Sequence, residues 1–206
     1  EIPAPEGLAY LPFQRAAIAY GLARPAVLFG DEMGLGKTIE AIGVLNADPT
    51  LRRILVVCPA SLKINWSREL TKWLTRPLTV KIANGTALPE CDVLIVNFEI
   101  LVKHSAALHA AEWAAIIVDE SHRLKSPEAQ RTEQVFGTDE YRAKKLRESG
   151  KESKIVQPIR ARRKMLLTGT PIPNRTKEGY GQFHYLAPNA FPNAFGFYRR
   201  YSGATQ

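Results

Sequence analysis

The chain has 206 residues, of which 45% are hydrophobic and 23% are charged, a composition that predicts one globular domain with a substantial core. Its longest apolar runs, such as residues 114–118, are far shorter than the roughly 18 residues needed to cross a bilayer, which excludes a membrane-spanning segment. The formal net charge of +8 favours a polyanionic partner, with nucleic acid as the obvious candidate.

The elements follow one another as short apolar strands and helix-compatible stretches. This alternation predicts an α/β fold whose central sheet is mainly parallel and has helices on both faces. The predicted strands are 26–29, 54–58, 79–82, 93–96, 115–118 and 165–168. After the second strand, SLKINWSRELTKWL (61–74) predicts a helix with Ser61 as its N-cap and with Trp66 and Trp73 on its core face.

The two cysteines each lie beside an apolar, strand-like run. Cys58 and Cys91 are therefore expected to be buried free thiols in a reducing compartment, with a disulfide as the alternative. No metal-like spacing accompanies them.

One segment, residues 138–164, interrupts the alternation with ten basic and four acidic residues, so that it holds most of the excess charge. It is either a solvated helix and loop or a surface that contacts a phosphate backbone. The aromatic-rich end, residues 183–201, allows two interpretations as well. Its rings either pack the last helices or stack on bases beside Arg199 and Arg200.

The stretch GDEMGLGKT (30–38) resembles a phosphate-binding loop, although the strict Walker pattern requires a glycine where this chain has Asp31. It lies between an apolar strand and a helix-compatible run, as such loops do. Gly34 and Gly36 would let backbone N–H groups approach a phosphate. Lys37 would neutralise phosphate charge, and the Thr38 hydroxyl would ligate Mg²⁺. A purely structural glycine turn is the alternative.

A second polar element follows the apolar strand 115–118, where two carboxylates stand side by side. Ligands of open α/β sheets bind at this edge. Asp119 would hold Mg²⁺, usually through water, and Glu120 would orient and deprotonate an attacking water. A helix N-cap is the alternative for such a pair.

Six motifs in order carry a family resemblance. They are LPFQ with Gln14, DEMGLGKT at 31–38, VVCPASLKINW at 56–66, VLIVNFEIL at 93–101, DESH at 119–122 and LLTGTPIPNR at 166–175. Together they resemble helicase superfamily two, specifically the Swi/Snf family of DNA-translocating ATPases, over nearly the whole chain. That family is similar to this chain in its DE-x-G-x-GKT loop. The resemblance therefore implies a variant phosphate loop on a RecA-like, P-loop NTPase lobe.

The resemblance also assigns roles by position, with ATP and Mg²⁺ as cofactors. The residues implied to bind ATP are Gln14, Asp31, Glu32, Met33, Gly34, Leu35, Gly36, Lys37 and Thr38. Lys37, Asp119 and Glu120 would be catalytic, with Thr38 and Asp119 on the metal. Contacts with the backbone of double-stranded DNA are implied for Pro59, Ser61, Lys63, Asn97 and Phe98, and coupling between hydrolysis and movement for His122, Thr168, Gly169 and Thr170. Asn97 and Phe98 depart from the usual Ser-Tyr of the family.

The resemblance further implies that residues 1–206 are the first of two RecA-like lobes, with a basic insertion at about 138–157. The arginines that complete the ATP site would come from a second lobe of the same polypeptide, outside this chain. The isolated lobe is then expected to be nearly inactive, because loss of an arginine finger costs roughly 10³ to 10⁵ in rate.

The function implied is that of a DNA-dependent ATPase and translocase that remodels protein–DNA or branched-DNA structures. It would act in the nucleoid of a prokaryote or the nucleus of a eukaryote, with no membrane partner. One alternative is a strand-separating helicase or restriction-type translocase of the same superfamily. Another is a non-catalytic nucleic-acid-binding module.

Overall fold

The computed structural model describes residues 1–126 and 129–203, which fall into two compact units. Unit 1 comprises Glu1–Glu120 and Arg160–Gly169, and unit 2 comprises Ser121–Ile159 and Thr170–Gln206. Each unit is described by itself. Among the described residues, no helix combines the length and apolar character that crossing a bilayer requires.

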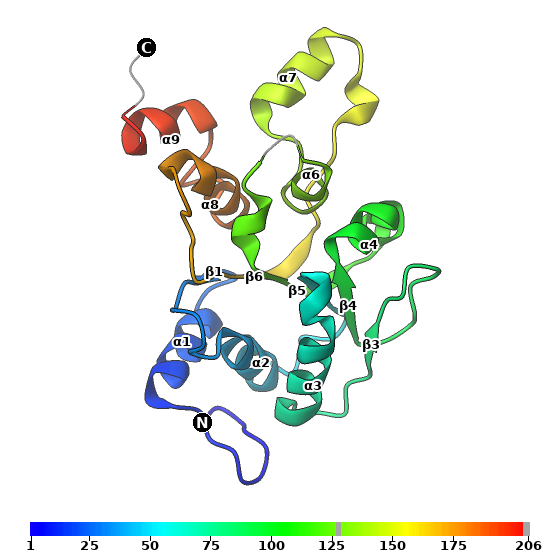
Figure 1. The fold of residues 1–206 in the computed structure, drawn as a ribbon, viewed down its shortest axis with the longest axis vertical. Coiled ribbons are helices and arrows are strands. Elements are labelled where there is room, and N and C mark those ends of the chain that lie inside the picture. Colours follow the sequence, from blue (N-terminus) through cyan, green and yellow to red (C-terminus); the bar gives the residue numbers. More distant parts are fainter. Residues whose placement is uncertain (127–128, 204–206) are drawn as a thin grey trace. The chain divides into compact units, whose positions relative to one another are not determined.

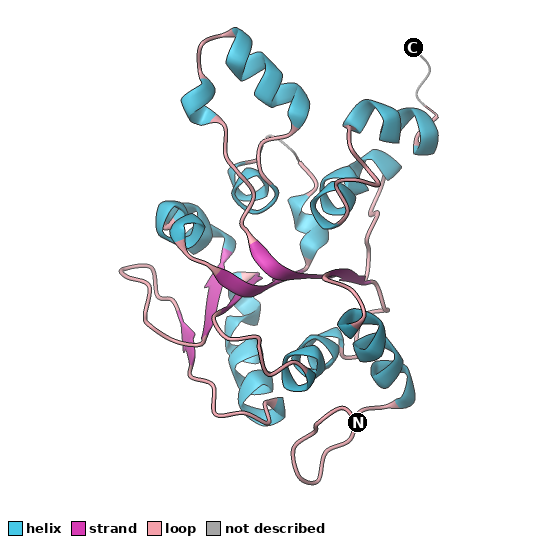
Figure 2. Cartoon of the chain, turned by 180° about the vertical axis from the view of Figure 1, so that it is seen from behind, coloured by secondary structure: helices cyan, strands magenta, loops and turns pink. Residues whose placement is uncertain are grey.

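Unit 1 is built on a six-stranded sheet in which every strand pairing is parallel (Figures 1 and 2). Its strands are β1 (Ala26–Phe29), β2 (Ile54–Cys58), β3 (Val80–Ile82), β4 (Val93–Asn97), β5 (Trp113–Asp119) and β6 (Ala161–Leu167). They lie in the order β1-β6-β5-β2-β4-β3. The prediction of an α/β fold around a parallel sheet is thereby confirmed.

Helices cover both faces of this sheet, as predicted. The helices of unit 1 are α1 (Pro12–Leu22), α2 (Lys37–Ala47), α3 (Lys63–Trp73), α4 (Phe98–Lys103) and α5 (Ser105–Ala110), with a 3-10 turn η1 (Ala60–Leu62). Figures 1 and 2 show α1, α2 and α3 on one face and α4 on the other. Strands β2, β4 and β5 are buried along their whole length, because both faces are covered.

The main core lies between the sheet and helices α1 to α3. Alternate residues of each strand point into it, such as Val56 of β2 and Ile117 of β5, and they pack with Ile18 of α1, Ile42 of α2 and Trp66 of α3. The two cysteines are free, with Cys58 buried in this core and Cys91 half-buried. The prediction of free thiols is confirmed.

Several element boundaries differ from the prediction, most of them by one or two residues. The helix expected at 61–74 begins at Lys63, and Ser61 lies in the preceding 3-10 turn and does not cap it. The position before the first helical residue is occupied by Leu62, without a side-chain cap. The last strand begins at Ala161, not at residue 165, because its first half is basic and carries no apolar strand pattern: Arg162 is exposed, and Arg163 and Lys164 are half-buried.

Because β6 starts early, the basic segment is divided. Arg160, Arg162, Arg163 and Lys164 belong to unit 1, where they precede or open strand β6. Residues 138–157 keep only six basic residues against four acidic ones. Little excess charge therefore remains on the expected insertion.

Unit 2 is helical among its described residues. Its elements are the 3-10 turns η2 (Ser121–Leu124), η3 (Glu152–Lys154) and η4 (Thr176–Gly179), and the helices α6 (Gln130–Phe136), α7 (Glu140–Glu148), α8 (Tyr180–Leu186) and α9 (Ala194–Tyr201). Asp139 caps α7 by accepting from two backbone N–H groups. Aromatic rings join α8 to α9, with Phe183 and Phe197 centroids 5.9 Å apart. This packing favours the interpretation of the aromatic-rich end as core.

Candidate functional site

The predicted motifs of unit 1 gather at the edge of the sheet where the parallel strands end. Phe29, the last residue of β1, pairs with Leu167 of β6, which in turn pairs with Asp119 at the end of β5. Cys58 and Asn97 end β2 and β4 side by side. The glycine loop, the Asp119–Glu120 pair and the Thr168–Gly169 segment therefore leave three adjacent strands at one edge, as open α/β sheets present their ligand sites.

The glycine loop runs from the end of β1 into α2, and Gly36 occupies the N-cap position of that helix. Gly34 and Gly36 have φ angles of +88° and +89°, a conformation that favours glycine. A Cβ on Gly36 would lie 2.7 Å from Nε2 of Gln14, whereas one on Gly34 would meet nothing within 4 Å. The loop is thus packed at Gly36 and open at Gly34, and the first backbone N–H groups of α2 follow it.

Gln14 ties the beginning of α1 to this loop. Its Nε2 donates to the carbonyl oxygen of Leu35 at 3.1 Å, and its Oε1 accepts from the backbone N–H of Leu11 at 3.0 Å. The side chain is only 4% exposed. Both ends of the amide are therefore engaged in holding the loop against α1.

The ammonium group of Lys37 lies over the loop. It donates to the carbonyl oxygen of Asp31 at 2.6 Å and to that of Glu32 at 3.0 Å. An ammonium that satisfies its donors with loop carbonyls is held at the sheet edge and can exchange those partners for phosphate oxygens.

A second carboxyl group, which the sequence interpretation did not use, lies beneath the loop. Glu40 is in the first turn of α2, and its side chain is fully buried. Burial, together with the neighbouring charge of Asp31, raises the pKa of Glu40 to about 8, while the charge of Lys37 opposes the shift. In the part of the chain that the structure describes, no donor hydrogen-bonds to either carboxyl oxygen of Glu40. Asp31, where the strict pattern has glycine, therefore faces a carboxyl that favours its neutral form.

The two carboxylates after β5 differ in their surroundings. Asp119 is buried: Oδ2 accepts from the indole N–H of Trp66 at 2.8 Å, and Oδ1 accepts from the backbone N–H of Glu120 at 2.8 Å. Burial raises the pKa of Asp119, and these two hydrogen bonds oppose the rise. Glu120 is half-buried and has a φ of +51°. A non-glycine residue in the left-handed region is strained, and such strain is often stored at functional sites.

The donor set fits a hard divalent cation that is held partly by other ligands. No group of three or more His, Cys, Asp or Glu side chains gathers into a metal site among the described residues. Mg²⁺ needs no such cage, because one or two protein oxygens together with waters and phosphates complete its octahedron. Both Asp119 oxygens already accept one hydrogen bond, which leaves lone pairs for the water shell of a cation.

Thr168 and Gly169 adjoin the glycine loop within unit 1. The backbone N–H of Thr168, which is fully buried, donates to the carbonyl of Phe29 at 3.1 Å. A Cβ on Gly169 would lie 2.9 Å from Cγ of Met33. The segment after β6 is therefore in direct contact with the loop after β1.

The remaining coupling residues, His122 and Thr170, belong to unit 2, and both have interactions. Within that unit, the buried Ser121 donates to Oε1 of Gln182 at 2.6 Å, and Nε2 of Gln182 donates to the carbonyl oxygen of Pro171 at 3.1 Å. Gln182 of α8 thus bridges the residues that follow Glu120 and those that follow Gly169.

The predicted DNA contacts of unit 1 divide into exposed and buried positions. Ser61 is exposed, and Lys63 is half-buried with its ammonium 3.4 Å from the carbonyl of Ala83. The side chains of Pro59, Asn97 and Phe98 are buried, and Asn97 donates to the carboxylate of Glu99. Only Ser61 and Lys63 therefore present side-chain polar groups near the surface.

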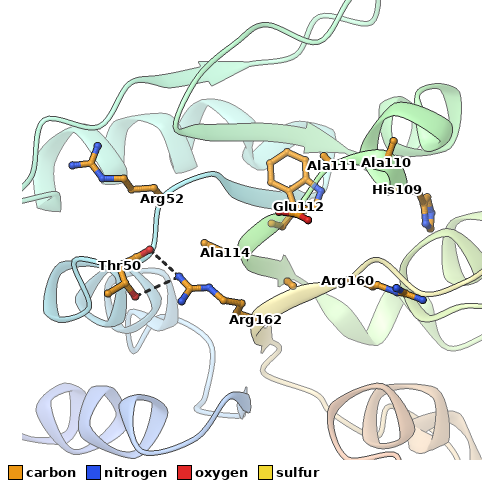
Figure 3. A pocket seen from close by; sticks show the side chains of 11 residues that line it. Thr50, Arg52, His109, Ala110, Ala111, Glu112, Ala114, Arg160 and Arg162 are labelled. Carbon is orange, nitrogen blue, oxygen red and sulfur yellow. Dashed lines mark hydrogen bonds between the residues drawn. The ribbon is translucent and has the colours of Figure 1, made fainter.

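A hollow of about 620 Å³ lies at the opposite edge of the sheet, where the strands begin (Figure 3). Arg162 points toward Thr50 and donates to its carbonyl oxygen at 2.8 Å. Figure 3 shows the guanidinium groups of Arg52 and Arg160 pointing in opposite directions. The guanidinium groups that line this hollow therefore do not converge on a common point.

The SNF2-related domain model matches residues 14–204 of this chain. The chain belongs to the SNF2-related family. Its relatives include the DNA annealing helicase and endonuclease ZRANB3 of Mus musculus, 32% identical over 94% of this chain and 17% of that protein. Another relative is the SWI/SNF-related matrix-associated actin-dependent regulator of chromatin subfamily A-like protein 1 of Xenopus tropicalis, 33% identical over 95% of this chain and 19% of that protein. The chain thus spans less than a fifth of each relative.

A solved structure, the Sulfolobus solfataricus SWI2/SNF2 ATPase core in complex with dsDNA, shares the fold. It superposes with a TM-score of 0.77 at 23% identity and covers 98% of this chain and 41% of that one. The resemblance to the Swi/Snf family and the RecA-like fold are thereby confirmed.

Sequence reasoning missed three residues of this SNF2-related domain. Trp66 was assigned to the core alone, Glu40 was not considered, and Gln182 had no role. Glu40 could have been found as a lone acid inside the apolar run TIEAIGVL. The partners of Trp66 and Gln182 are 53 and 61 residues away along the chain, and no local pattern indicates them.

Proposed function

We propose that this chain is the ATP-binding lobe of a double-stranded-DNA-dependent ATPase that translocates on DNA and remodels protein–DNA or branched-DNA structures. The observation that carries the proposal is that Lys37, which follows β1, and the Asp119–Glu120 pair, which ends and follows β5, lie at the same edge of the sheet, where both strands pair with β6. Burial raises the pKa of Asp119, and the charge of Lys37 opposes that rise.

The side chains divide the work of hydrolysis by their positions. Lys37 transfers its donors from the loop carbonyls to the phosphates, and the N-terminus of α2 adds its N–H groups. Glu120, half-buried and carried on a strained backbone, orients and deprotonates the attacking water. Gln14 and residues 31–36 shape the loop that receives the nucleotide. Thr168 and Gly169 couple changes in that loop to movement through their contacts with Phe29 and Met33.

The metal site would consist of the Thr38 hydroxyl and the Asp119 carboxylate. Mg²⁺, when bound, supplies charge that neutralises the phosphates during transfer. The protein holds the carboxylate ready through two hydrogen bonds, one to each oxygen. This arrangement suits a contact that is made through water.

The central test is DNA-stimulated ATP hydrolysis by the full-length protein and two variants. Lys37→Ala should abolish nucleotide binding and turnover, whereas Glu120→Gln should bind ATP and fail to hydrolyse it. Arg162→Ala, at the opposite edge of the sheet, is the matched control and should behave as the parent. Unchanged turnover in either site variant would refute the proposal, and an absence of turnover in the parent protein would favour a non-catalytic nucleic-acid-binding module.

Duplex DNA is the proposed partner, with contacts to its backbone from the turn that opens α3. Ser61 and Lys63 offer polar groups there, whereas Pro59, Asn97 and Phe98 would contribute through backbone atoms. Ser61→Asp should lower duplex affinity in a fluorescence-anisotropy titration. An unchanged affinity would remove this surface from the proposal.

Helix α7 is the less favoured DNA surface. Arg142 pairs with Glu133 at 3.1 Å, Lys144 pairs with Glu148 at 3.9 Å, and Lys145 lies over the ring of Tyr141. These cations are already engaged within unit 2, which supports the solvated-helix interpretation. Reversing the charges of Lys144, Lys145 and Arg147 should leave duplex affinity unchanged, and a loss would assign α7 to DNA.

A second lobe of the same polypeptide would complete the ATP site with activating arginines. The 206-residue chain alone should then turn over roughly 10³ to 10⁵ times more slowly than the full-length protein with duplex DNA. Robust turnover by the short chain would place the activating arginine within it.

A labelled-strand displacement assay separates translocation on duplex DNA from strand separation, which is the alternative activity. A nuclear or nucleoid location follows from the DNA partner.

A further inference from the structure

Helix α3 carries an indole that contacts the metal-anchoring carboxylate. Nε1 of Trp66 donates to Oδ2 of Asp119 at 2.8 Å, between residues 53 positions apart in sequence. Trp66 is 1% exposed and lies in the core between α3 and the sheet. Because its ring is fixed by packing, the direction of its N–H is fixed as well, and so is the oxygen that accepts from it.

We propose that Trp66 is a positioning residue for the magnesium-bound nucleotide: its indole N–H fixes the orientation of the Asp119 carboxylate and ties that carboxylate to α3. The inference rests on the proposed function, since it assigns Asp119 to the metal. It gives a role to Trp66, the last residue of the motif at 56–66, which the sequence analysis assigned to the core only.

Satisfaction of a buried indole does not by itself explain this contact. The other two tryptophans of the chain solve the same problem differently. Trp113 donates to the backbone carbonyl of Leu108 at 2.8 Å, and the indole nitrogen of Trp73, on the same helix as Trp66, has no hydrogen-bond partner among the described residues. The fold therefore accommodates an indole with a backbone acceptor or with none, and at Trp66 it uses a side-chain carboxylate at the candidate site.

The second oxygen of Asp119 shows why the donor matters. Oδ1 accepts from the backbone N–H of Glu120, so each oxygen of the carboxylate is held by a different donor. Removal of the indole N–H would leave one buried oxygen without that donor and free the carboxylate to rotate. Partners that orient metal ligands are typically worth 10- to 100-fold in metal affinity.

Trp66 also lies close to a proposed DNA contact on the same helix. Lys63, a proposed DNA contact, is three residues before Trp66, on the first turn of α3. Residues three apart in a helix are neighbours on its surface. Trp66 therefore joins the helix that would touch DNA to the carboxylate that would hold the metal.

The experiment compares Trp66→Phe with Trp73→Phe in the full-length protein. Both variants replace an indole by a phenyl ring on one helix, but only the first removes a donor to Asp119. The probe is mant-ADP, whose binding is followed by fluorescence while free Mg²⁺ is titrated. Trp66→Phe should require about tenfold more Mg²⁺ for half-maximal tightening, with the affinity in EDTA unchanged. Trp73→Phe should match the parent in both.

An equal Mg²⁺ requirement in Trp66→Phe and the parent, or an equal shift in both variants, would overturn the inference. Should Trp66→Phe fail to fold in a thermal melt, benzothienylalanine at position 66 keeps the bicyclic shape and replaces N–H with sulfur, and the same criteria apply to it.

Failure of the proposed function has a different signature. It would appear as Mg²⁺-independent binding of mant-ADP by the parent, or as normal hydrolysis by Glu120→Gln. With both of those tests passed, an unshifted Trp66→Phe would reject the positioning role alone.

Discussion

The two edges of the parallel sheet in unit 1 use charged residues in different ways. At the edge where strands begin, arginines bond backbone carbonyls: Arg76 donates to those of Leu45, Pro49 and Leu51, and Arg162 donates to that of Thr50. At the edge where strands end, Lys37 donates to carbonyls of its own loop, and its charge and that of Glu120 act on the pKa of the buried Asp119 carboxyl. The first edge stabilises the chain, and the second holds groups whose partners can change.

The difference follows from the direction of the helices. Helix α2 begins at the carboxyl edge, where its free N–H groups attract anions, and ends near Arg76, where its last carbonyls need donors. The N-terminus of α2 thus favours an anion, and its C-terminus favours a cation such as the Arg76 guanidinium. Substitutions at the two edges should accordingly separate activity from stability.

The largest effect is expected for Lys37→Ala. Loss of the ammonium should lower DNA-stimulated kcat/KM for ATP by about a hundredfold or more, because it removes charge stabilisation at the transferring phosphate. The melting temperature should change little, since the two hydrogen bonds that Lys37 makes are to carbonyls of its own loop. Steady-state kinetics with a thermal melt of the same preparation measures both. A stability loss with retained activity would reverse the roles of the two edges.

Arg76→Ala should show the opposite pattern. The guanidinium donates to one carbonyl in the last turn of α2 and to two in the segment that follows it, so its loss should cost about 2–3 kcal/mol in the free energy of unfolding. Denaturant titration gives this value. Arg68→Ala, on the exposed side of α3, is the matched control and should stay within about 0.5 kcal/mol of the parent. Turnover per folded molecule should be unchanged in both variants, and a selective loss in Arg76→Ala would extend the site to this edge.

The contrast between the edges was only partly predictable from the sequence. The carboxyl edge carries motifs, and GDEMGLGKT and the Asp119–Glu120 pair indicated both the site and the parallel sheet that assembles it. The amino edge carries none, since Arg76 acts on carbonyls between 25 and 31 residues away. Arg162 and Arg163, which open β6, belonged to a segment that was interpreted from its basic composition as a solvated or DNA-binding insertion. The early start of β6 was missed for that reason.

Long-range side-chain contacts explain the remaining misses. The hydrogen bond of Trp66 to Asp119 requires α3 and β5 to be placed in three dimensions, which periodicity alone does not do. Ser61 looked like an N-cap from local pattern, but the chain after Pro59 forms a 3-10 turn first, so α3 begins two residues later.

The buried acid at the carboxyl edge gives a pH dependence. Burial and the neighbouring Asp31 raise the pKa of Glu40 from 4.5 to about 8, so the folded state holds a proton that the unfolded state has released. Stability should therefore fall as pH rises from the unfolded value to about 8, by about 2 kcal/mol between pH 6 and pH 8. Glu40→Gln, which cannot ionise, should remove this slope. Denaturant titrations at several pH values measure the stability of both proteins. If the stability of the parent and that of the variant change with pH in the same way, Glu40 is ionised in the fold.

The smallest expected effect has the opposite sign and belongs to the amino edge. Hydrogen bonds from the hydroxyl and backbone N–H of Thr79 lower the pKa of Asp92, which directly precedes β4. An acid with a lowered pKa stabilises the fold above its ordinary value of 3.8 and loses that contribution as pH falls through the folded value. Because the carboxylate is largely solvated, screening holds the effect below about 1 kcal/mol. The parent should exceed Asp92→Asn in stability at pH 6, and the difference should shrink by pH 3. A stability difference that grows as the pH falls would show that the fold does not lower the pKa of Asp92.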